Sequence, residues 1–322
     1  KIKGIKESFD WLGFITLSLG IGSLTTAFMQ AQNWGWLSWK TLSLIALGII
    51  LPLILFKAER KVAHPIVDLK VILKKSVLAG SGCVFCIQFL TMVTVFWAIY
   101  FQDILHFSPT KAGVFAFFAN APLLIASALG GYLVDHYGPR LPVSTGFALV
   151  SFSLFFLLFI SPPPYIWLLF VTLVPFGFGI PMIMTPSFVS ILNDVPSEKR
   201  GAVSGFTASL RQFSSTIGLA LFGTLFTTIQ RQKMQNELLS IPETSSIKAS
   251  DLEGVLSNST HAMQTLSSLS ASAQELAVQF AKNAFNKAFI VINIGAVIVA
   301  LTGFLIAFKL LRNQPIHLLK KK

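Results

Sequence analysis

The sequence predicts an all-helical (all-α) polytopic membrane protein with eight transmembrane helices. Hydrophobic residues make up 53% of the 322 residues and charged residues only 12%, about half the charged share of a soluble domain. Eight long apolar stretches follow one another, each near or above the ~20 residues that a helix needs to span a bilayer. Runs of this length lack the strict alternation of barrel strands, which excludes a β-barrel. The stretches lie at 10–30, 39–57, 75–101, 110–134, 141–160, 164–192, 199–229 and 281–310.

The first two predicted helices are joined by a tryptophan-rich turn. Trp34, Trp36 and Trp39 cluster where the first helix should leave the membrane, and an amphipathic indole ring suits that interface. Residues 1–10, ahead of the first helix, are basic and polar and contain no cleavable apolar core. We therefore expect an opened loop at this end and no secretory signal.

The third predicted helix carries Cys83 and Cys86 in a C-x-x-C arrangement. The surroundings are apolar and the chain has no second cysteine pair, so we expect small-residue packing here and neither metal nor redox chemistry. The sequence indicates no metal ligands and no cofactor site elsewhere.

The sixth predicted helix is rich in residues that disturb a helix. Proline removes an internal hydrogen bond and glycine loosens the backbone, so we do not expect a straight rod. A bent helix suits gating, but passive packing also produces such bends, and both interpretations stay open. The residues concerned are Pro175, Gly177, Gly179, Pro181 and Pro186.

Arg211 is a cation placed deep inside the seventh predicted helix. It follows Arg200 by 11 residues, which puts it ~16 Å into the membrane, about half way. It shares a small, polar face with Ser204 and Ser215, whereas an apolar stripe covers the opposite face. A charge at this depth indicates a substrate cavity or pathway, with a structural bond to neighbouring carbonyls as the alternative.

Four uncharged polar residues also lie well inside predicted spans. Side chains of this kind either join helices by hydrogen bonds or contact a ligand in a substrate cavity, and the sequence leaves both roles open. They are Gln88, Thr91, Asn120 and Asn293.

The segment 231–284 has a soluble character and is rich in Ser, Gln, Ala and Leu. Its spacing predicts two short amphipathic helices, around 248–257 and 262–282. We expect an outer loop that forms a solvated cap or connector, with a docking site for a partner as the alternative.

The distribution of charge predicts the orientation of the chain. The formal net charge of +12 would also suit a nucleic-acid-binding protein. Most Lys and Arg residues, however, fall in alternate short loops and at the two ends of the chain. This positive-inside pattern predicts an integral protein of the lipid bilayer with both termini in the cytoplasm, and it argues against a nucleic-acid partner.

None of the 13 acidic residues, and no histidine, lies at mid-membrane depth in a predicted span. A proton relay normally uses a buried carboxylate or imidazole, so that group is expected outside this chain if the protein moves protons. The predicted spans also lack a nucleophile and base pair, which argues against an enzyme.

The segment 130–140, G-G-Y-L-V-D-H-Y-G-P-R, lies between two predicted spans on the basic side. It resembles the G-x-L-x-D-x-x-G-x-R cytoplasmic-loop signature of the major facilitator superfamily, which is matched by Gly131, Asp135, Gly138 and Arg140. His106 departs from the resemblance because the family often has glycine there. Further segments resemble the fourteen-helix drug:proton antiporter branch, the EmrB/QacA type, namely 9–13, 33–36, 102–105, 108–109, 112–113 and 204–212.

In that family two six-helix bundles flank an extra helix pair. The resemblance implies that residues 1–74 hold two linker-type transmembrane helices and a cytoplasmic loop, and that 75–322 form the C-terminal six-helix bundle with the outer loop 231–284. The N-terminal six-helix bundle, with the family's proton-carrying acidic residue, is then expected to be missing from this chain. Spans three, four, six and seven would line the central cavity.

The resemblance implies a secondary active transporter in a bacterial plasma (inner) membrane. Its expected activity is proton-coupled efflux of drugs or amphipathic toxic compounds, with protons, a small-molecule substrate and a periplasmic adaptor protein as partners. The alternatives are an exporter or importer of a specific metabolite and a non-transporting membrane receptor or scaffold. Asp135 and Arg140 are expected to form a cytoplasmic latch, because the turn between them is too tight to hold a ligand.

Overall fold

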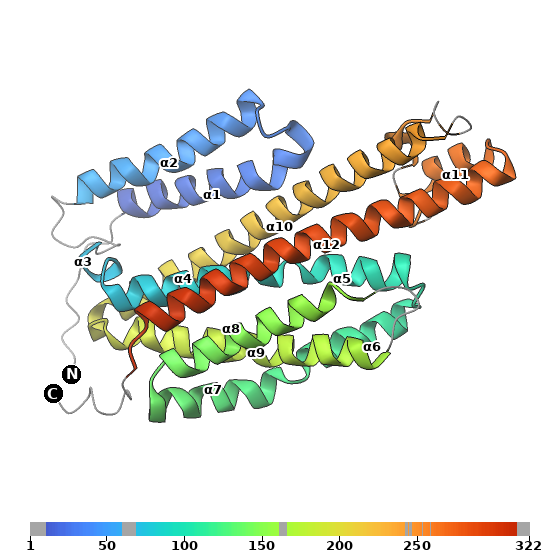
Figure 1. Ribbon diagram of the computed structural model, residues 1–322. Coiled ribbons are helices and arrows are strands. Elements are labelled where there is room, and N and C mark those ends of the chain that lie inside the picture. The colour runs from blue at the N-terminus through green and yellow to red at the C-terminus, as the bar shows by residue number, and fades with distance from the viewer. Residues whose placement is uncertain are drawn as a thin grey trace.

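The computed structural model describes residues 11–59, 69–160, 166–241, 244, 247–252, 254–257 and 259–313 (Figure 1). Every regular element in this part of the chain is helical. Residues 1–10, where we expected an opened loop, lie outside the described residues. The elements are α1 (Trp11–Trp34), α2 (Trp39–Glu59), α3 (Leu69–Ile72), α4 (Lys75–Thr91), α5 (Thr94–Ile99), η1 (Tyr100–Ile104), α6 (Pro109–Asn120), α7 (Leu123–Tyr137), α8 (Arg140–Leu157), α9 (Ile166–Asn193), η2 (Ser197–Lys199), α10 (Arg200–Leu239), η3 (Ala249–Leu252), α11 (Thr260–Ser267) and α12 (Ala271–Leu310).

The predicted fold class is confirmed. Within the described residues, six helical stretches are long and apolar enough to cross a membrane, and α2 adds a shorter apolar stretch, Trp39–Ile54. Together with α1 they follow the eight predicted stretches in order. The six are Lys75–Ile104, Pro109–Tyr137, Arg140–Leu157, Ile166–Asn193, Ser197–Leu239 and Ala271–Leu310.

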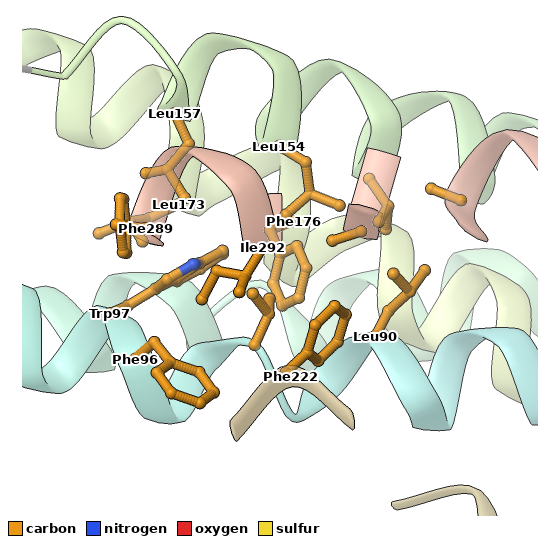
Figure 2. Packing of buried hydrophobic residues seen from close by; sticks show 14 of the residues in the cluster. Leu90, Phe96, Trp97, Leu154, Leu157, Leu173, Phe176, Phe222, Phe289 and Ile292 are labelled. Atoms are coloured by element: carbon orange, nitrogen blue, oxygen red, sulfur yellow. The ribbon is translucent and has the colours of Figure 1, made fainter. Parts of the chain in front are cut away.

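Aromatic and aliphatic side chains together fill the centre of the bundle formed by these six stretches (Figure 2). Trp97 of α5 packs edge to face on Phe176 of α9, with ring centroids 4.7 Å apart. Tyr100 of η1 stacks on Phe289 of α12 at 4.4 Å. Because pairs of this kind contribute about 0.5–1.5 kcal/mol beyond the burial of their surface, they hold α9 and α12 firmly to the third span.

Small residues let the helices of the bundle approach one another closely. A Cβ added at Gly179 of α9 would lie 2.7 Å from the carbonyl oxygen of Gly146 in α8, and a Cβ added at Gly218 of α10 would lie 2.6 Å from the carbonyl oxygen of Phe89 in α4. Helices in a bilayer associate through van der Waals contact of this kind, since lipid tails remove the hydrophobic driving force.

The first two helices form an antiparallel pair that packs against α10 (Figure 1). The indole nitrogen of Trp36 donates a hydrogen bond to the Thr224 hydroxyl at 3.0 Å, and Phe28 meets Phe213 edge to face. Trp34 and Trp39 stay exposed. Of the three clustered tryptophans, Trp36 therefore fastens the pair to the bundle.

Two spans are interrupted, and the sixth is not. The third breaks between Thr91 and Thr94, and the fourth breaks between Asn120 and Leu123. The sixth span, expected to be disturbed by its prolines and glycines, is one continuous helix, α9, with three prolines inside it. The interruptions fall in α4–α5 and α6–α7 (Figure 1), and the expected bend of α9 stays a prediction.

The outer segment is more helical than expected. The spans α10 and α12 continue well beyond α5 and α6 at one end of the molecule, where they meet α11 (Figure 1). The predicted helix at 248–257 is reduced to η3, and the predicted helix at 262–282 is wrong as a unit, because it is divided between α11 and the start of α12. A separate apolar core stabilises this end, and it includes Met234, Leu238, Leu252, Leu266 and Phe280.

Candidate functional site

A cavity of about 420 Å³ lies between the two interrupted spans and α9. Its volume falls in the range of about 300–1,000 Å³ that is typical of small-molecule sites. Trp97, Phe101 and Phe176 give it a buried aromatic wall. Polar side chains line it as well, namely Thr91, Thr94, Gln102 and Asn120. We call it the main cavity.

Threonine hydroxyls stabilise the break in the third span. Around the break the amide of Met92 bonds the Phe89 carbonyl, three residues back, instead of the Gln88 carbonyl, four residues back. The Thr91 hydroxyl donates to the freed Gln88 carbonyl at 2.7 Å, and the Thr94 hydroxyl donates to the Thr91 carbonyl at 2.7 Å. The carbonyls of Gln88 and Thr91 are therefore hydrogen-bonded at the break, and an unpaired carbonyl there would be costly in a membrane interior.

Proline makes the break in the fourth span. Pro122 has no amide hydrogen, so the carbonyl four residues before it receives no helical hydrogen bond. Gly177 of α9 lies directly against this break, since a Cβ added there would sit 2.2 Å from the Ala119 carbonyl oxygen. Beside the break, the side-chain amide of Asn120 donates to the Ala116 carbonyl at 2.8 Å.

Gln88 bridges two helices and does not line the main cavity. Its side-chain nitrogen donates to the Ser215 hydroxyl of α10 at 2.9 Å, and that hydroxyl donates to the Arg211 carbonyl at 3.1 Å. Of the residues predicted for a substrate cavity, the structure brings Thr91 and Asn120 together around the main cavity.

Arg211 lies on an exposed face of α10. Its guanidinium makes no hydrogen bond or ion pair with any residue in the part of the chain that the structure describes. A second cavity of about 270 Å³ begins one residue further along α10, at Gln212, and extends to α1. Its lining is Phe28, Met29, Met92, Gln212, Ser215, Thr216, Leu219 and Ala220.

Asn293 is fully buried in α12, away from both cavities. Its amide nitrogen donates to the Phe289 carbonyl of its own helix at 2.7 Å. Among the described residues its amide oxygen has no partner. Its surroundings are those of the bundle core.

The helix-disturbing residues of α9 face neighbouring helices. Gly177 meets the break in the fourth span and Gly179 meets α8, as described above. Pro181 and Pro186 are buried, Pro175 is half-buried, and none of these three lines the main cavity. The α9 side chains that do line it are Leu173, Phe176 and Ile180.

The loop between the fourth and fifth spans has a glycine-specific turn. Gly138 has a φ of +80°, in the left-handed region that favours glycine. The guanidinium carbon of Arg140 lies 4.1 Å from the centroid of the Phe308 ring in α12. Asp135 is exposed at the end of α7, and a Cβ at Gly131 would meet nothing within 4 Å. Arg140 thus contacts its own bundle, and Asp135 is exposed at the surface.

A polar cluster at the same end of the molecule was not predicted. The carboxylate of Asp194, just after α9, accepts a hydrogen bond from the Ser76 hydroxyl of α4 and pairs with Arg312 at 3.2 Å. The Lys74 ammonium donates to the Asp194 carbonyl at 2.8 Å. The sequence shows these residues only as separate loop and helix-end positions, so their meeting has no local signal.

The aromatic wall of the main cavity was missed too, although Trp97 and Phe101 are four residues apart and share one helix face. None of the described residues that line the main cavity is charged. No group of three His, Cys, Asp or Glu residues in the described part could hold a metal ion. The cavity can therefore bind a small molecule through aromatic contact and neutral hydrogen bonds.

Residues 4–219 match the family model of the Major Facilitator Superfamily. The chain is 26% identical to the multidrug resistance protein Stp of Mycobacterium tuberculosis, over 67% of the chain and 40% of that protein. It is 30% identical to the lincomycin resistance protein LmrB of Listeria monocytogenes, over 71% of the chain and 49% of LmrB. It is 26% identical to the riboflavin transporter RibZ of Clostridioides difficile, over 69% of the chain and 56% of RibZ.

The chain spans about half the length of these relatives. A solved structure is also similar, that of a bacterial homologue of the human lysosomal transporter Spinster in an inward-facing, unoccupied conformation. It has a TM-score of 0.49 and 13% sequence identity, and the match covers 92% of this chain and 69% of that one.

Proposed function

Because the chain belongs to the major facilitator superfamily, we propose that it forms part of a secondary active transporter that exports drugs or amphipathic toxic compounds in exchange for protons. The chain is an integral membrane protein of a transporter family and not an enzyme. The observation that carries the proposal is the main cavity, whose aromatic wall and uncharged polar groups suit an amphipathic small molecule. Relatives named for multidrug resistance and lincomycin resistance support it.

Proton coupling normally uses a carboxylate or an imidazole, and the described spans hold neither at mid-membrane depth. Their acidic side chains lie near helix ends, for example Asp103 at the end of η1, Asp135 at the end of α7 and Glu237 at the end of α10. We therefore assign the coupling carboxylate to an N-terminal six-helix bundle of a longer protein.

A transporter of a specific metabolite is the second candidate, because the relative RibZ is named a riboflavin transporter. One aromatic cavity can serve either function, since a planar metabolite and a planar drug make the same contacts with its wall. Only the breadth of the accepted compounds separates the two candidates.

The sidedness that we propose follows from the basic loops. Both termini of the chain would lie on the cytoplasmic side of a bacterial plasma membrane. The extended ends of α10 and α12, with α11, would then project from the outer side, where a periplasmic adaptor protein could meet them.

The test is the susceptibility of a deletion strain to a panel of dyes, detergents and uncouplers. We expect the deletion to increase susceptibility to several unrelated compounds and the wild-type gene to restore resistance. Gly113 lines the main cavity and a Cβ added there would meet nothing within 4 Å, so its backbone tolerates a side chain. The ring of Gly113→Trp should block the cavity, and this variant should fail to restore resistance at wild-type expression. Gly113→Ala is the matched control and should restore it. A phenotype confined to one metabolite would favour the second candidate.

A further inference from the structure

The hydrogen-bonding groups on the wall of the main cavity offer more acceptor lone pairs than donor hydrogens. We propose that this wall selects aromatic ligands that carry N–H or O–H donors, and that Asn120 and Gln102 determine this specificity. The inference rests on the proposed function, because it assumes that the main cavity holds the transported compound.

Each of the two side-chain amides that line the main cavity is oriented by a hydrogen bond to its own helix. Asn120 donates through Nδ2 to the Ala116 carbonyl at 2.8 Å, and Gln102 donates through Nε2 to the Ala98 carbonyl at 3.2 Å. A carbonyl only accepts, so the NH₂ group of each amide must face the helix. Each amide oxygen is left without a partner among the described residues.

The threonine hydroxyls of the main cavity have already used their hydrogens. Thr91 donates to the Gln88 carbonyl and Thr94 donates to the Thr91 carbonyl. A hydroxyl whose hydrogen is engaged offers a ligand only its oxygen lone pairs. Asn120 and Gln102 each keep one free N–H, and the buried indole N–H of Trp97 has no partner among the described residues. The Thr91 oxygen already accepts from Gln88 Nε2 at 3.4 Å. The lone pairs of the two amide oxygens and of the Thr94 oxygen still outnumber the three donors.

Charged side chains do not change this preference for ligands that carry donors. No described residue that lines the main cavity is charged, and the nearest cation along α6, Lys111, lies over the Phe107 ring at 3.9 Å. An anionic ligand would therefore meet acceptor oxygens without a compensating cation, whereas a donor-bearing neutral molecule or cation would find partners. Trp97, Phe101 and Phe176 provide the surface for its aromatic body.

Two acridine dyes test whether the main cavity prefers ligands with N–H donors. Proflavine has two amino groups with N–H donors, and acridine orange is the same planar ring system with both amino groups dimethylated, so its exocyclic nitrogens donate nothing. We would measure the dissociation constant of each dye by fluorescence polarisation on the purified full-length protein. We expect proflavine to bind at least about fivefold more tightly, the ratio that one net hydrogen bond of about 1 kcal/mol supplies.

Asn120→Leu and Gln102→Leu should each weaken proflavine binding toward that of acridine orange and leave acridine orange nearly unchanged. Thr302→Ala is the matched control, because Thr302 is exposed on α12, away from both cavities, and bonds the Ile298 carbonyl of its own helix at 2.8 Å. It should change neither constant. Equal losses for both dyes, or none, would overturn the inference.

The dye-binding measurement and the resistance assay together distinguish a failure of this inference from a failure of the proposed function. A wild-type protein that confers resistance to the wider panel but binds the two dyes equally well, or binds neither, would overturn the donor preference alone. A protein that confers no resistance to any compound would overturn the proposed function, and the inference would fall with it.

Discussion

The charge of Arg211 is the residue-level feature that most directly tests the proposed pathway. An unpaired cation at this depth costs several kcal/mol, so a substrate, a partner acceptor or water must meet it. We expect Arg211→Ala to insert and express but to lose most transport, by about tenfold or more, which corresponds to about 1.4 kcal/mol. Arg211→Lys should be intermediate, because lysine keeps the charge and loses the planar fork of donors.

Expression and efflux of the Arg211 variants would be measured together in the deletion strain. Lys233→Ala is the control, since Lys233 also lies on α10 but pairs with Glu237 on the surface at 3.1 Å. Normal transport by Arg211→Ala for several substrates would show that the residue only packs or reaches to the interface. Failure of Arg211→Ala to insert would instead establish a structural role.

Gly177 is the position where an added methyl group should disturb the fold. A Cβ there would lie 2.2 Å from the Ala119 carbonyl oxygen, so α9 and the fourth span must separate to accept it. We expect Gly177→Ala to lower the free energy of unfolding by about 1–3 kcal/mol, the usual cost of overpacking. Thermal unfolding of the purified protein would measure this. Gly22→Ala, with nothing within 4 Å of its Cβ, should not lower the melting temperature.

Single residues could be recognised from the sequence, but their partners could not. Gly177 stands out as part of a run of glycines and prolines in one helix, and Arg211 stands out because a charged or polar side chain inside a span is costly. Asn293 stands out for the same reason, yet it lies in the bundle core. The sequence does not tell which face of a helix meets the cavity, so a polar residue inside a span can lie in either place. The departure at His106 is informative, since it has a φ of +52° at a turn where the resembling family often has glycine.

The break between α6 and α7 leads to a prediction about a whole element. Pro122→Ala restores an amide that can bond the Phe118 carbonyl, so the two helices should become continuous. We expect transport to fall by about tenfold, while the free energy of unfolding stays the same or rises by up to ~1 kcal/mol. The measurement is efflux together with thermal unfolding.

Pro142→Ala is the control for that substitution. Pro142 lies in the first turn of α8, where amides have no helical partner, so its replacement should leave transport unchanged. If Pro122→Ala transports as well as wild type, the break is a packing feature that transport does not use.

Hydropathy located the spans well and their ends poorly. The continuation of α10 to Leu239 and the start of α12 at Ala271 were missed, because these turns are polar on one face and resemble a loop. The break in the third span was missed for a different reason. Residues 91–94 include neither proline nor glycine, and the interruption depends on threonine hydroxyls that take up a freed carbonyl.

The packing of the whole molecule could not be read from the sequence. The contact of the first helix pair with α10 depends on Trp36 and Thr224, which are 188 residues apart. Asp194, Ser76 and Arg312 likewise come together from three separate loops or helix ends. Periodicity describes one helix at a time, so contacts between distant helices remain undetermined until the chain is folded.

The relation between the two proposed bundles leads to the last prediction, which concerns Asp135. Arg140 is held against Phe308 of its own bundle, whereas Asp135 is exposed at the cytoplasmic end of α7 in the proposed orientation. A carboxylate there can meet the positive N-terminal end of a helix in another bundle, a contact of about 0.3–1 kcal/mol. Asp135→Asn keeps the shape of the side chain and removes its charge. Transport should therefore fall by about two- to fivefold.

Substrate binding should stay nearly intact in Asp135→Asn, because the residue lines neither cavity. The measurement pairs efflux in cells with dye binding to the purified protein. Glu198→Gln is the control, since Glu198 is exposed at the same end and accepts a hydrogen bond from the adjacent Ser197 hydroxyl at 2.7 Å. A large loss of binding with unchanged transport would refute the latch, because a latch acts on the exchange between conformations and not on the affinity of the cavity.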